Sequence, residues 1–414
     1  MTKQPKIRFK GFTEEWKEKG FSELVTIRRG LTYSPESIVS EDGIVVLRSS
    51  NISDGQFRTY KDDVRVRNEV VHIPLVEDGD ILITAANGSK DLVGKHAVIH
   101  NLQEPSVPGG FMLLASGKET TFVNALMGSS WYSHFIGLST CGGGGSIGNL
   151  NKSDLESQIV YIPNDKAERD IIAKYFDSLD STITSREAEL EKLKNIRSAF
   201  LKKLFPQDGQ STPTIRFKEF TDEWKRTKLC DFLIEHPERN FKEEFNREDV
   251  LSVSGDLGIG NQIELLGRSY AGQCVNNYHV VRFGNIVYTK SPLKEYPYGI
   301  VKVNRGVDGI VSTLYAVYDV KENADGNFVE YYFTDLERIN MYLKPIVRIG
   351  AKHDMKIGNE EVLQNFVSFP SRLEQEKVGT ILTALDKVIT ARERQLTLLK
   401  HTKQALLEQM FVNE

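Results

Sequence analysis

Cysteine is scarce in this sequence, and so are long apolar runs and any large excess of one charge. Cys141, Cys230 and Cys274 lie far apart without a CxxC pair, which argues against a disulfide framework, a zinc site or a redox pair. We therefore expect buried or incidental thiols. No uncharged apolar run approaches the roughly 20 residues that span a membrane. The first residues, MTKQPKIRFKGF, lack the apolar core of a secretory signal, so a cytoplasmic location is the default expectation.

The balance of charge is nearly even, with a formal net charge of -4 over 414 residues. This value does not indicate a nucleic-acid binder, but it does not exclude one, because a local basic cleft matters more than the total. The length is too great for one ordinary core and predicts several domains.

The motifs of catalysis are also missing or poorly placed. Residues 143–148 satisfy GxGxxG, but they follow an amphipathic helical stretch instead of a buried strand, so we interpret them as a glycine loop near a binding surface. His96 and His100 lack the glutamate of HExxH and are interpreted as structural or surface histidines. There is no Walker lysine, no Asn-Pro-Pro-Tyr loop for a flipped adenine and no recognisable nucleophile set. No catalytic residue and no metal ligand is predicted.

An internal repeat organises the chain. The segment PKIRFKGFTEEWK at 5–17 returns as PTIRFKEFTDEWK at 213–225. We interpret each copy as a short strand and turn that docks an aromatic pair and a tryptophan on the domain that follows. The segment FPQDGQSTP at 205–213 is the clearest linker and joins the two halves.

The longest repeated element is a helical pattern at 165–205 and again at 371–411, with a constant offset of 206. Apolar residues recur at steps of three and four, which a helix places on one seam. Arg186 and Arg392 interrupt the seam at matching points, and either partner docking or a snorkelling arginine explains them. The predicted seam comprises Leu179, Ile183, Arg186, Leu190, Leu193, Leu385, Ile389, Arg392, Leu396 and Leu399.

The interiors of the two halves keep a pattern but little sequence identity. Short β-branched runs separated by Gly, Asn and Asp indicate a mixed α+β domain in each half, and amphipathic helices are predicted from Phe122 and Phe328. Strands at 159–163 and 366–370 end in proline just before the long helices. The predicted division is a globular domain at 1–163, a helical region at 164–206, a linker at 207–212, a second globular domain at 213–370 and a second helical region at 371–414.

Polar, basic and glycine residues recur in loops at equivalent places in the two halves. Arg, Lys and Asn side chains can contact bases or phosphates, and glycine lets the backbone approach a groove, so these loops are candidate DNA contacts. Solvated surface loops are the alternative interpretation. The candidates are Ser49, Asn51, Thr84, Asn87, Ser89, Lys90, Gly143, Gly144, Ser146, Ser254, Thr289, Lys290, Ser291, Lys294, Tyr296, Arg348, Lys352 and His353.

Taken together, these features resemble the specificity (S) subunit of type I restriction-modification systems over essentially the whole chain. The resemblance rests on the Arg-Phe-x-x-Phe-Thr-(Glu/Asp)-Glu-Trp segments at 8–16 and 216–224 and on the Gly-Asp-Ile-Leu-Ile-Thr run at 79–84. It also rests on the two helical segments, each with a Leu-Asp-x-x-Ile core. It implies two pseudo-symmetric target-recognition domains separated by two long antiparallel helices that form a coiled coil.

The same resemblance implies a non-catalytic subunit in which each domain reads one half of a bipartite, asymmetric DNA target. The helices, roughly 60 Å long at 1.5 Å per residue, would set the spacer between the halves. Two methyltransferase (M) subunits would dock on this chain and carry S-adenosylmethionine, and restriction (R) subunits would use ATP and Mg; no cofactor is expected on this chain. Recognition domains vary within the family, so no base contact is transferred by motif.

Two other classes remain open at this point. A self-contained DNA methyltransferase or nuclease would need a cofactor or metal constellation, which we do not find in the sequence. A structural coiled-coil adaptor would explain the helices but would leave two related, divergent globular domains without a role.

Overall fold

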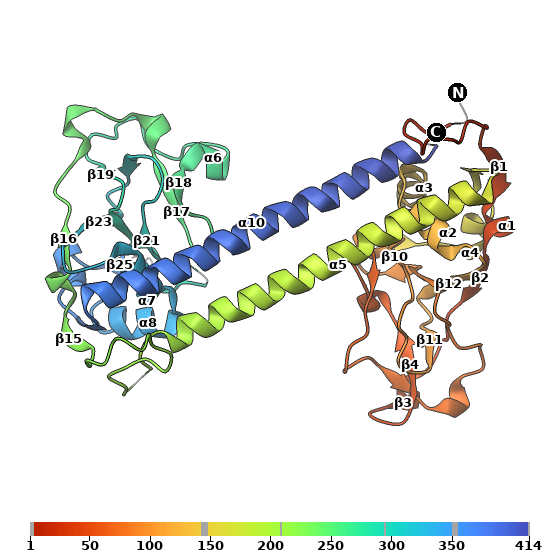
Figure 1. The fold of residues 1–414 in the computed structure, drawn as a ribbon, viewed down its shortest axis with the longest axis horizontal. Helices are drawn as coiled ribbons and strands as arrows, with labels where there is room; N and C mark the ends of the chain where they lie inside the picture. The colour runs from red at the N-terminus through yellow and green to blue at the C-terminus, as the bar shows by residue number, and fades with distance from the viewer. Residues whose placement is uncertain (1–3, 142–147, 208, 294, 350–354, 413–414) are drawn as a thin grey trace. The chain divides into compact units, whose positions relative to one another are not determined.

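The computed structural model describes residues 4–141, 148–207, 209–293, 295–349 and 355–412 (Figure 1). The chain divides into two compact units. Unit 1 contains residues 1–188 and 394–414, and unit 2 contains residues 189–393. Helices α5 (Lys166–Lys203) and α10 (Arg372–Met410) each contribute one part to unit 1 and the other part to unit 2. Each unit is therefore a globular domain together with a segment of both long helices.

The globular part of unit 1 is built on a four-stranded antiparallel sheet in the order β10-β8-β12-β2. A second sheet has the order β11-β4-β7-β3 and includes one parallel pair, β11 with β4. The strands are β1 (Lys17–Gly20), β2 (Thr26–Arg29), β3 (Ile38–Val39), β4 (Ile44–Leu47), β5 (Ile52–Ser53), β6 (Gln56–Phe57), β7 (Arg65–Val66), β8 (Ile81–Thr84), β9 (Ala86–Asn87), β10 (His96–Val98), β11 (Ser106–Pro108), β12 (Met112–Ser116), β13 (Gly148–Asn149) and β14 (Ile159–Ile162).

Four short helices complete unit 1: α1 (Phe21–Leu24), α2 (Thr120–Met127), α3 (Ser130–Cys141) and α4 (Lys152–Glu156). The helix predicted from Phe122 is confirmed as α2, which packs on β10. Its buried face joins the core beneath the sheet, where the β-branched residues of β8 and β12 are also buried. The alternation of burial needed for a half-exposed strand is absent from β8, because both of its faces are covered.

Unit 2 repeats the main sheet of unit 1 and, in place of its second four-stranded sheet, has the two-stranded sheets β17-β18 and β19-β22. Its four-stranded antiparallel sheet has the order β16-β23-β20-β21, and β15 pairs with β26 as β1 pairs with β14. The strands are β15 (Lys225–Lys228), β16 (Leu233–Glu235), β17 (Leu251–Ser254), β18 (Gly258–Asn261), β19 (His279–Val281), β20 (Ile286–Thr289), β21 (Val301–Val303), β22 (Gly309–Val311), β23 (Tyr315–Val320), β24 (Arg348–Ile349), β25 (Met355–Lys356) and β26 (Phe366–Phe369).

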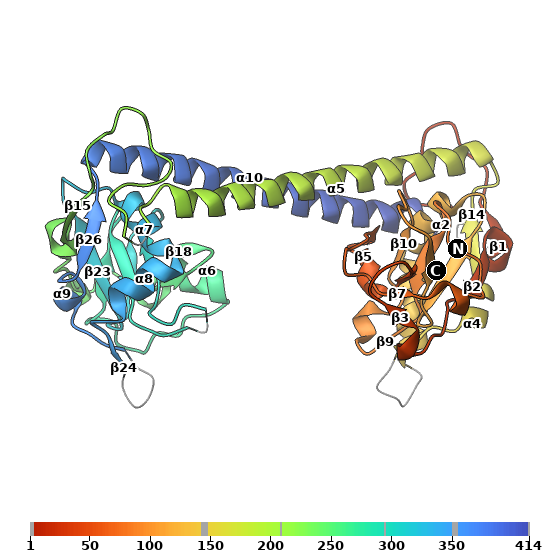
Figure 2. The same cartoon turned by 90° about the horizontal axis from the view of Figure 1, so that it is seen from below.

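The short helices of unit 2 are α6 (Gln262–Leu266), α7 (Gly326–Thr334), α8 (Leu336–Leu343) and α9 (Asn359–Val362). The helix predicted from Phe328 is confirmed as α7, which contacts β21 and α8. Figure 2 labels α7 and α8 in this unit. The predicted mixture of strands and helices in both halves is thus confirmed. No helix in the described part of the chain is long and apolar enough to cross a membrane.

The repeated lead-ins differ from their prediction in one respect. Residues 5–12 and 213–220 form turns and extended loops, and the strands predicted there begin only at Lys17 and Lys225. The reason is that each lead-in pairs with a helix end instead of with a sheet. Ile7 N donates to Gln409 O at 3.0 Å, and Ile215 N donates to Lys203 O at 2.9 Å. The predicted docking of the tryptophans is confirmed, because Trp16 and Trp224 are buried.

Each lead-in is also held by a buried arginine–carboxylate pair. Arg8 donates to both carboxylate oxygens of Glu168 at 2.6 and 2.8 Å, and Arg216 does the same to Glu374 at 2.8 Å for both bonds. A bidentate guanidinium–carboxylate pair fixes the relative orientation of the two side chains as well as the distance between them. These bonds raise the pKa of both arginines, so the two guanidinium groups stay charged throughout the physiological range. They lock the start of each repeat to the start of its long helix.

The end of each long helix fills the core of the unit that begins with the other repeat. Phe411 lies against Trp16, Phe122 and Phe176 in unit 1, with ring centroids 5.9 to 6.0 Å apart. In unit 2, Phe205 lies against Trp224 at 6.2 Å and Phe328 at 5.3 Å. Phe205 and Phe411 occupy the same position of the repeat. The two halves of the chain therefore exchange equivalent helix ends.

Ion pairs across the helices occur at equivalent positions in both units. In unit 1, Asp180 pairs with Lys403 and Glu187 with Lys400, the latter at 2.8 Å. Unit 2 has the same two pairs, Asp386 with Arg197 and Glu393 with Lys194, the latter at 2.7 Å. Within each unit the α5 number rises as the α10 number falls, so the helices run antiparallel.

The residues of the predicted seam differ in burial. Ile183, Leu190 and Ile389 are buried, and Leu179, Leu193, Leu385, Leu396 and Leu399 are half-buried. Two arginines interrupt the apolar seam. Arg186 is exposed and Arg392 is half-buried, and both take part in interactions. The ion pairs that connect the two helices across the seam are formed by the neighbouring residues described above.

The exchanged phenylalanines give a direct test of this arrangement. Phe411→Ala and Phe205→Ala each remove an aromatic ring from a packed core, so each is expected to lower the free energy of unfolding by roughly 3–5 kcal/mol. Hydrogen exchange should accelerate in β8 and β12 for Phe411→Ala, and in β20 and β23 for Phe205→Ala. Leu398→Ala, in α10, which ends one residue before Phe411, is the control; this leucine is 67% exposed, so its replacement should change little. Faster exchange in the same unit for both phenylalanine variants would contradict the exchange of helix ends.

Candidate nucleic-acid interface

In unit 1, several candidate residues come together where the strands of the sheet end. Asn87 Nδ2 donates to Ser49 Oγ at 3.0 Å, and Asn87 Oδ1 accepts from Ser89 N at 2.9 Å. Lys90 follows as an exposed side chain. β13 pairs with β9 through Gly148 and Asn87, so the chain after the glycine loop reaches the same edge. Gly143, Gly144 and Ser146 themselves lie outside the described residues.

Three candidates are buried inside their units, which corrects their place in the predicted set. Asn51 accepts from Arg48 N at 2.8 Å and donates to Arg58 O and to the carboxylate of Asp63, so it closes a turn. Thr84 is buried in β8, and Thr289 Oγ1 accepts from Ile300 N at 2.8 Å. Sequence reasoning selected these positions by their place in the repeat, and the repeat also preserves structural residues.

In unit 2, the equivalent strand end carries different chemistry. Lys290 Nζ donates to Asn359 Oδ1 at 2.6 Å, and Asn359 Nδ2 donates to Glu235 Oε1 at 2.7 Å. Burial lowers the pKa of Lys290. The next residue, Ser291, is half-buried. This edge therefore presents an ammonium, an amide and a carboxylate where unit 1 presents an amide and hydroxyls.

The remaining unit 2 candidates are spread over several loops. Ser254 Oγ accepts from Leu257 N at 3.2 Å in the turn between β17 and β18. Tyr296 packs on Gly255 of the same turn, and burial raises the pKa of its hydroxyl. Arg348 is exposed on β24, opposite Lys356 of β25. Lys294, Lys352 and His353 lie outside the described residues.

A cleft of about 1360 Å³ lies in unit 1 between β10, α2 and α3 on one side and the two helix segments on the other. Its walls carry both signs of charge, with Asp54 and Asp180 as well as Lys400 and Lys403. Lys400 also pairs with Asp54 at 2.9 Å. A phosphate backbone needs an excess of cations, so this cleft does not have the electrostatics of a DNA groove.

His96, on the wall of this cleft, is a structural histidine as predicted. Its Nδ1 lies 2.8 Å from Asn124 Oδ1, and its ring stands edge-on to Tyr132. Burial lowers its pKa to about 4, so it is neutral at physiological pH. In the part of the chain that the structure describes, no group of three or more His, Cys, Asp or Glu is placed to hold a metal ion. Cys230 and Cys274 are free thiols.

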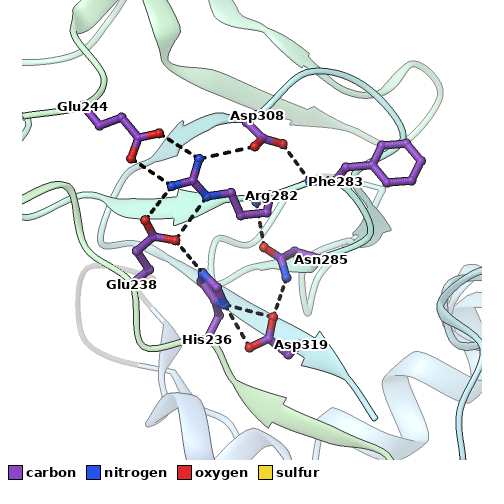
Figure 3. A network of polar contacts seen from close by, with 8 residues as sticks. All are labelled: His236, Glu238, Glu244, Arg282, Phe283, Asn285, Asp308 and Asp319. Carbon is purple, nitrogen blue, oxygen red and sulfur yellow. Dashed lines mark hydrogen bonds and ion pairs between the residues drawn. The ribbon is translucent and has the colours of Figure 1, made fainter. Parts of the chain in front are cut away.

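Figure 3 shows a polar network in unit 2 that sequence reasoning missed. Arg282 donates to Glu238 at 2.6 Å, to Glu244 at 2.9 Å and to Asp308 at 3.3 Å. Asp308 also accepts from Phe283 N at 2.8 Å. These bonds raise the pKa of Arg282 and occupy its donors. Arg282 therefore serves the fold of unit 2 and is not available to a phosphate.

The network continues to the sheet through a fourth carboxylate, that of Asp319. His236 Nδ1 lies 2.9 Å from Asp319, and Asn285 Nδ2 donates to Asp319 Oδ1 at 2.7 Å (Figure 3). Asn285 Oδ1 in turn accepts from Arg282 N at 2.7 Å. The residues come from four separate stretches, and no sequence spacing reveals their proximity.

Sequence reasoning also missed two exposed apolar residues beside the candidate loops. Phe111 and Leu314 directly precede β12 and β23. An apolar residue at the start of a β-rich run has the sequence signature of core, so its exposure is not predictable from the pattern. Only the glycine pair before Phe111 indicates an unusual turn.

Comparison with known proteins places this architecture in a class. The family model of the type I restriction modification DNA specificity domain matches residues 13–195. The type I restriction enzyme StySPI specificity subunit of Salmonella potsdam is 27% identical over 229 residues, which cover 54% of this chain and 49% of that protein. The EcoKI specificity subunit of Escherichia coli K12 is 25% identical over 300 residues, which cover 67% of this chain and 61% of that protein. The match thus spans about half to three fifths of these relatives.

The fold agrees with a solved structure over its whole length. The crystal structure of a type I restriction-modification S subunit from M. genitalium matches with a TM-score of 0.61 at 12% identity, covering 99% of this chain and 100% of that one. Residues 13–195 are thus a type I restriction modification DNA specificity domain. The chain as a whole is similar in sequence to the specificity subunits named above and in fold to the solved S subunit.

The Arg282 network predicts a pH-dependent contribution to the stability of unit 2. Hydrogen bonds from Arg282 lower the pKa of Glu238 and Glu244. A lowered carboxylate pKa stabilises the folded state above the unfolded pKa, about 4.3, and this contribution is lost as pH falls through the folded value. Arg282→Met should lower the Tm at pH 7 by roughly 2–4 °C, and the difference from the wild type should close below about pH 4.

The matched control is Arg268→Met, because Arg268 is exposed over the ring of Tyr270 and no carboxylate is seen bonded to it in the described part of unit 2. Its Tm should equal that of the wild type at both pH values. A Tm difference for Arg282→Met that persists or grows at pH 3.5 would show that the arginine acts through packing and not through the three carboxylates.

Proposed function

We propose that this chain is the non-catalytic DNA-reading subunit of a type I restriction-modification complex, and that each unit binds one half of a bipartite, asymmetric target. The observation that carries the proposal is the repetition of one fold with different strand-end chemistry. Unit 1 presents Ser49 and Asn87, whereas unit 2 presents Lys290 and Asn359. Two units that share one fold but present different hydrogen-bonding groups are suited to bind two different base sequences.

The proposal also includes two equivalent docking sites for one kind of partner. Ten of the thirteen residues of the lead-ins 5–17 and 213–225 are identical. Packing explains the buried identities, such as Trp16 and Trp224. Packing does not explain identities at exposed positions in repeats whose interiors differ. The exposed identical pairs are Ile7 and Ile215, Lys10 and Lys218, Thr13 and Thr221, Glu15 and Glu223, and Lys17 and Lys225.

Two methyltransferase subunits, one on each unit, are the partner that fits this duplication. In this proposal they carry S-adenosylmethionine and the base-flipping pocket, and restriction subunits add the ATP- and Mg-dependent steps. This chain supplies recognition alone and holds no cofactor. The division of labour is consistent with a sequence that has no methyl-donor or base-pocket motif.

The helices would set the spacer between the two half-targets. The two ion pairs in each unit, such as Glu187 with Lys400 and Glu393 with Lys194, fix the register of the helices within that unit. The boundary between the units falls between residues 188 and 189 of α5 and between 393 and 394 of α10. Residues added at these two points would leave the ion pairs described above intact, because each of them lies within one unit.

The decisive experiment uses the chain co-purified with the methyltransferase subunits of its host. Methylome sequencing with and without the gene should reveal one asymmetric target of two short halves and a fixed gap. Gel shifts should show binding to that target, and replacing either half should weaken binding by at least about 100-fold, since each wrong base pair costs roughly 1–3 kcal/mol. Mass measurement should give two methyltransferase subunits per chain, and one when Ile7→Asp blocks a single lead-in.

The control DNA molecules keep one half-target and scramble the other. Tight calorimetric binding of S-adenosylmethionine by the isolated chain would instead support a self-contained methyltransferase. A complex that binds all DNA sequences equally would leave the chain with the role of an adaptor.

The spacer prediction is tested by adding one heptad after Ala188 and one after Glu393. Seven helical residues add about 10 Å and nearly two full turns. The methylated target should keep its bases and gain about three base pairs of spacer. A heptad in only one helix is the control, and it should abolish specific binding because the helices no longer match in length. Altered bases with an unaltered spacer would show that the helices do not set the distance.

A further inference from the structure

Phe111 and Leu314 occupy the same structural position in the two units. Each is the last residue before the strand that enters the centre of the main sheet, β12 or β23. Each closes a tight turn, because Met112 N donates to Gly109 O at 2.8 Å and Tyr315 N donates to Ser312 O at 3.0 Å. Phe111 is 74% exposed and Leu314 is 62% exposed.

The backbone of both residues is held firmly by the sheet. Phe111 O accepts from Ala85 N at 2.9 Å and from Ala86 N at 3.1 Å, and Leu314 O accepts from Lys290 N at 3.2 Å. A side chain on Gly110 would press on Leu31 O, 3.3 Å from the position of its Cβ. These bonds fix the backbone of both residues, and their apolar side chains are exposed.

Hydrogen-bonding groups flank both apolar residues. In unit 1, Ala86 leads directly to Asn87, and exposed Arg48 lies against the turn, with its Cγ 3.8 Å from where a Cβ on Gly109 would be. In unit 2, Lys290 itself donates the backbone bond to Leu314. Single exposed apolar residues are common on proteins. This general frequency does not explain why an exposed apolar residue recurs at the same position of two surfaces that otherwise differ.

We propose that Phe111 and Leu314 are the apolar base contacts of the two units, each packing against a thymine methyl group in its half-target. This inference rests on the proposed function. The thymine 5-methyl is the apolar feature of the major groove, and apolar side chains recognise it beside hydrogen-bonding ones. A phenylalanine in one unit and a leucine in the other give the two readers contacts of different size and reach.

The experiment replaces thymine by deoxyuridine, which removes only the methyl group. The probes are duplexes carrying the mapped target with every thymine of one half replaced, and the protein is the chain with its methyltransferase subunits. Replacement in the half read by unit 1 should weaken wild-type binding roughly three- to tenfold. Phe111→Ser should bind the normal target more weakly by a similar factor and should not respond to the replacement. Leu314→Ser should behave in the same way for the other half.

Matched controls lie at the opposite end of the neighbouring strands. Leu75 adjoins the start of β11, since Val76 N donates to Ser106 O, and Val307 lies just before β22. They are 45% and 68% exposed, and their serine variants should keep the wild-type response to deoxyuridine. All four variants change exposed side chains, so their Tm values should match the wild type.

The outcomes separate this inference from the function on which it rests. If the wild-type complex binds no bipartite target, the proposed function fails. If it binds one, but Phe111→Ser and Leu314→Ser respond to deoxyuridine as the wild type does, only the base-contact inference is overturned. A half-target without thymine, or an equal loss of binding to random DNA, would overturn it as well.

Discussion

The constraint on which the rest of the structure depends is the burial of each helix end in the unit that starts with the other repeat. Phe411 completes the core around Trp16, and Phe205 completes the core around Trp224. Unit 1 is built from two separate stretches of chain, whereas unit 2 is one stretch, residues 189–393, that spans the junction between the two repeats. The helices must therefore run antiparallel within each unit, and the lead-ins must lie beside the helix ends, as the backbone bonds of Ile7 and Ile215 show. A contiguous globular domain cut out at residue 163 would lack part of its own core.

The two copies of the repeat share the charged residues that connect the long helices and differ in the loops at the strand ends. The frame keeps its charges at matching positions, Asp180 with Asp386 and Glu187 with Glu393, each facing a basic residue of the other helix within its unit. Charged pairs at a partly apolar seam contribute more to register than to stability, because desolvation offsets much of their attraction. The strand-end loops are free of this constraint, and they differ between the units.

Prediction from sequence succeeded where only one kind of structure produces the observed pattern. It failed where buried structural residues and exposed loop residues produce the same pattern. The seam of Ile183 and Leu190 could only be a helix face, and the α+β character followed from short β-branched runs. Repetition alone could not separate Thr84, which is buried, from Ser49, which bonds Asn87 at a strand end. Arg282 and its carboxylates are brought together by tertiary structure from distant segments, and no local signal in the sequence reports it.

The exchange of helix ends also sets an order of events during synthesis. Domains generally fold as the ribosome releases them, from the N-terminus onward. Residues 1–188 of unit 1 emerge before any residue of unit 2, yet unit 1 needs Phe411, which follows every residue of unit 2. Unit 2 has all of its residues once Glu393 is made. Unit 1 is therefore completed after unit 2, and the nascent chain carries an open aromatic core around Trp16 until residue 411 has been made.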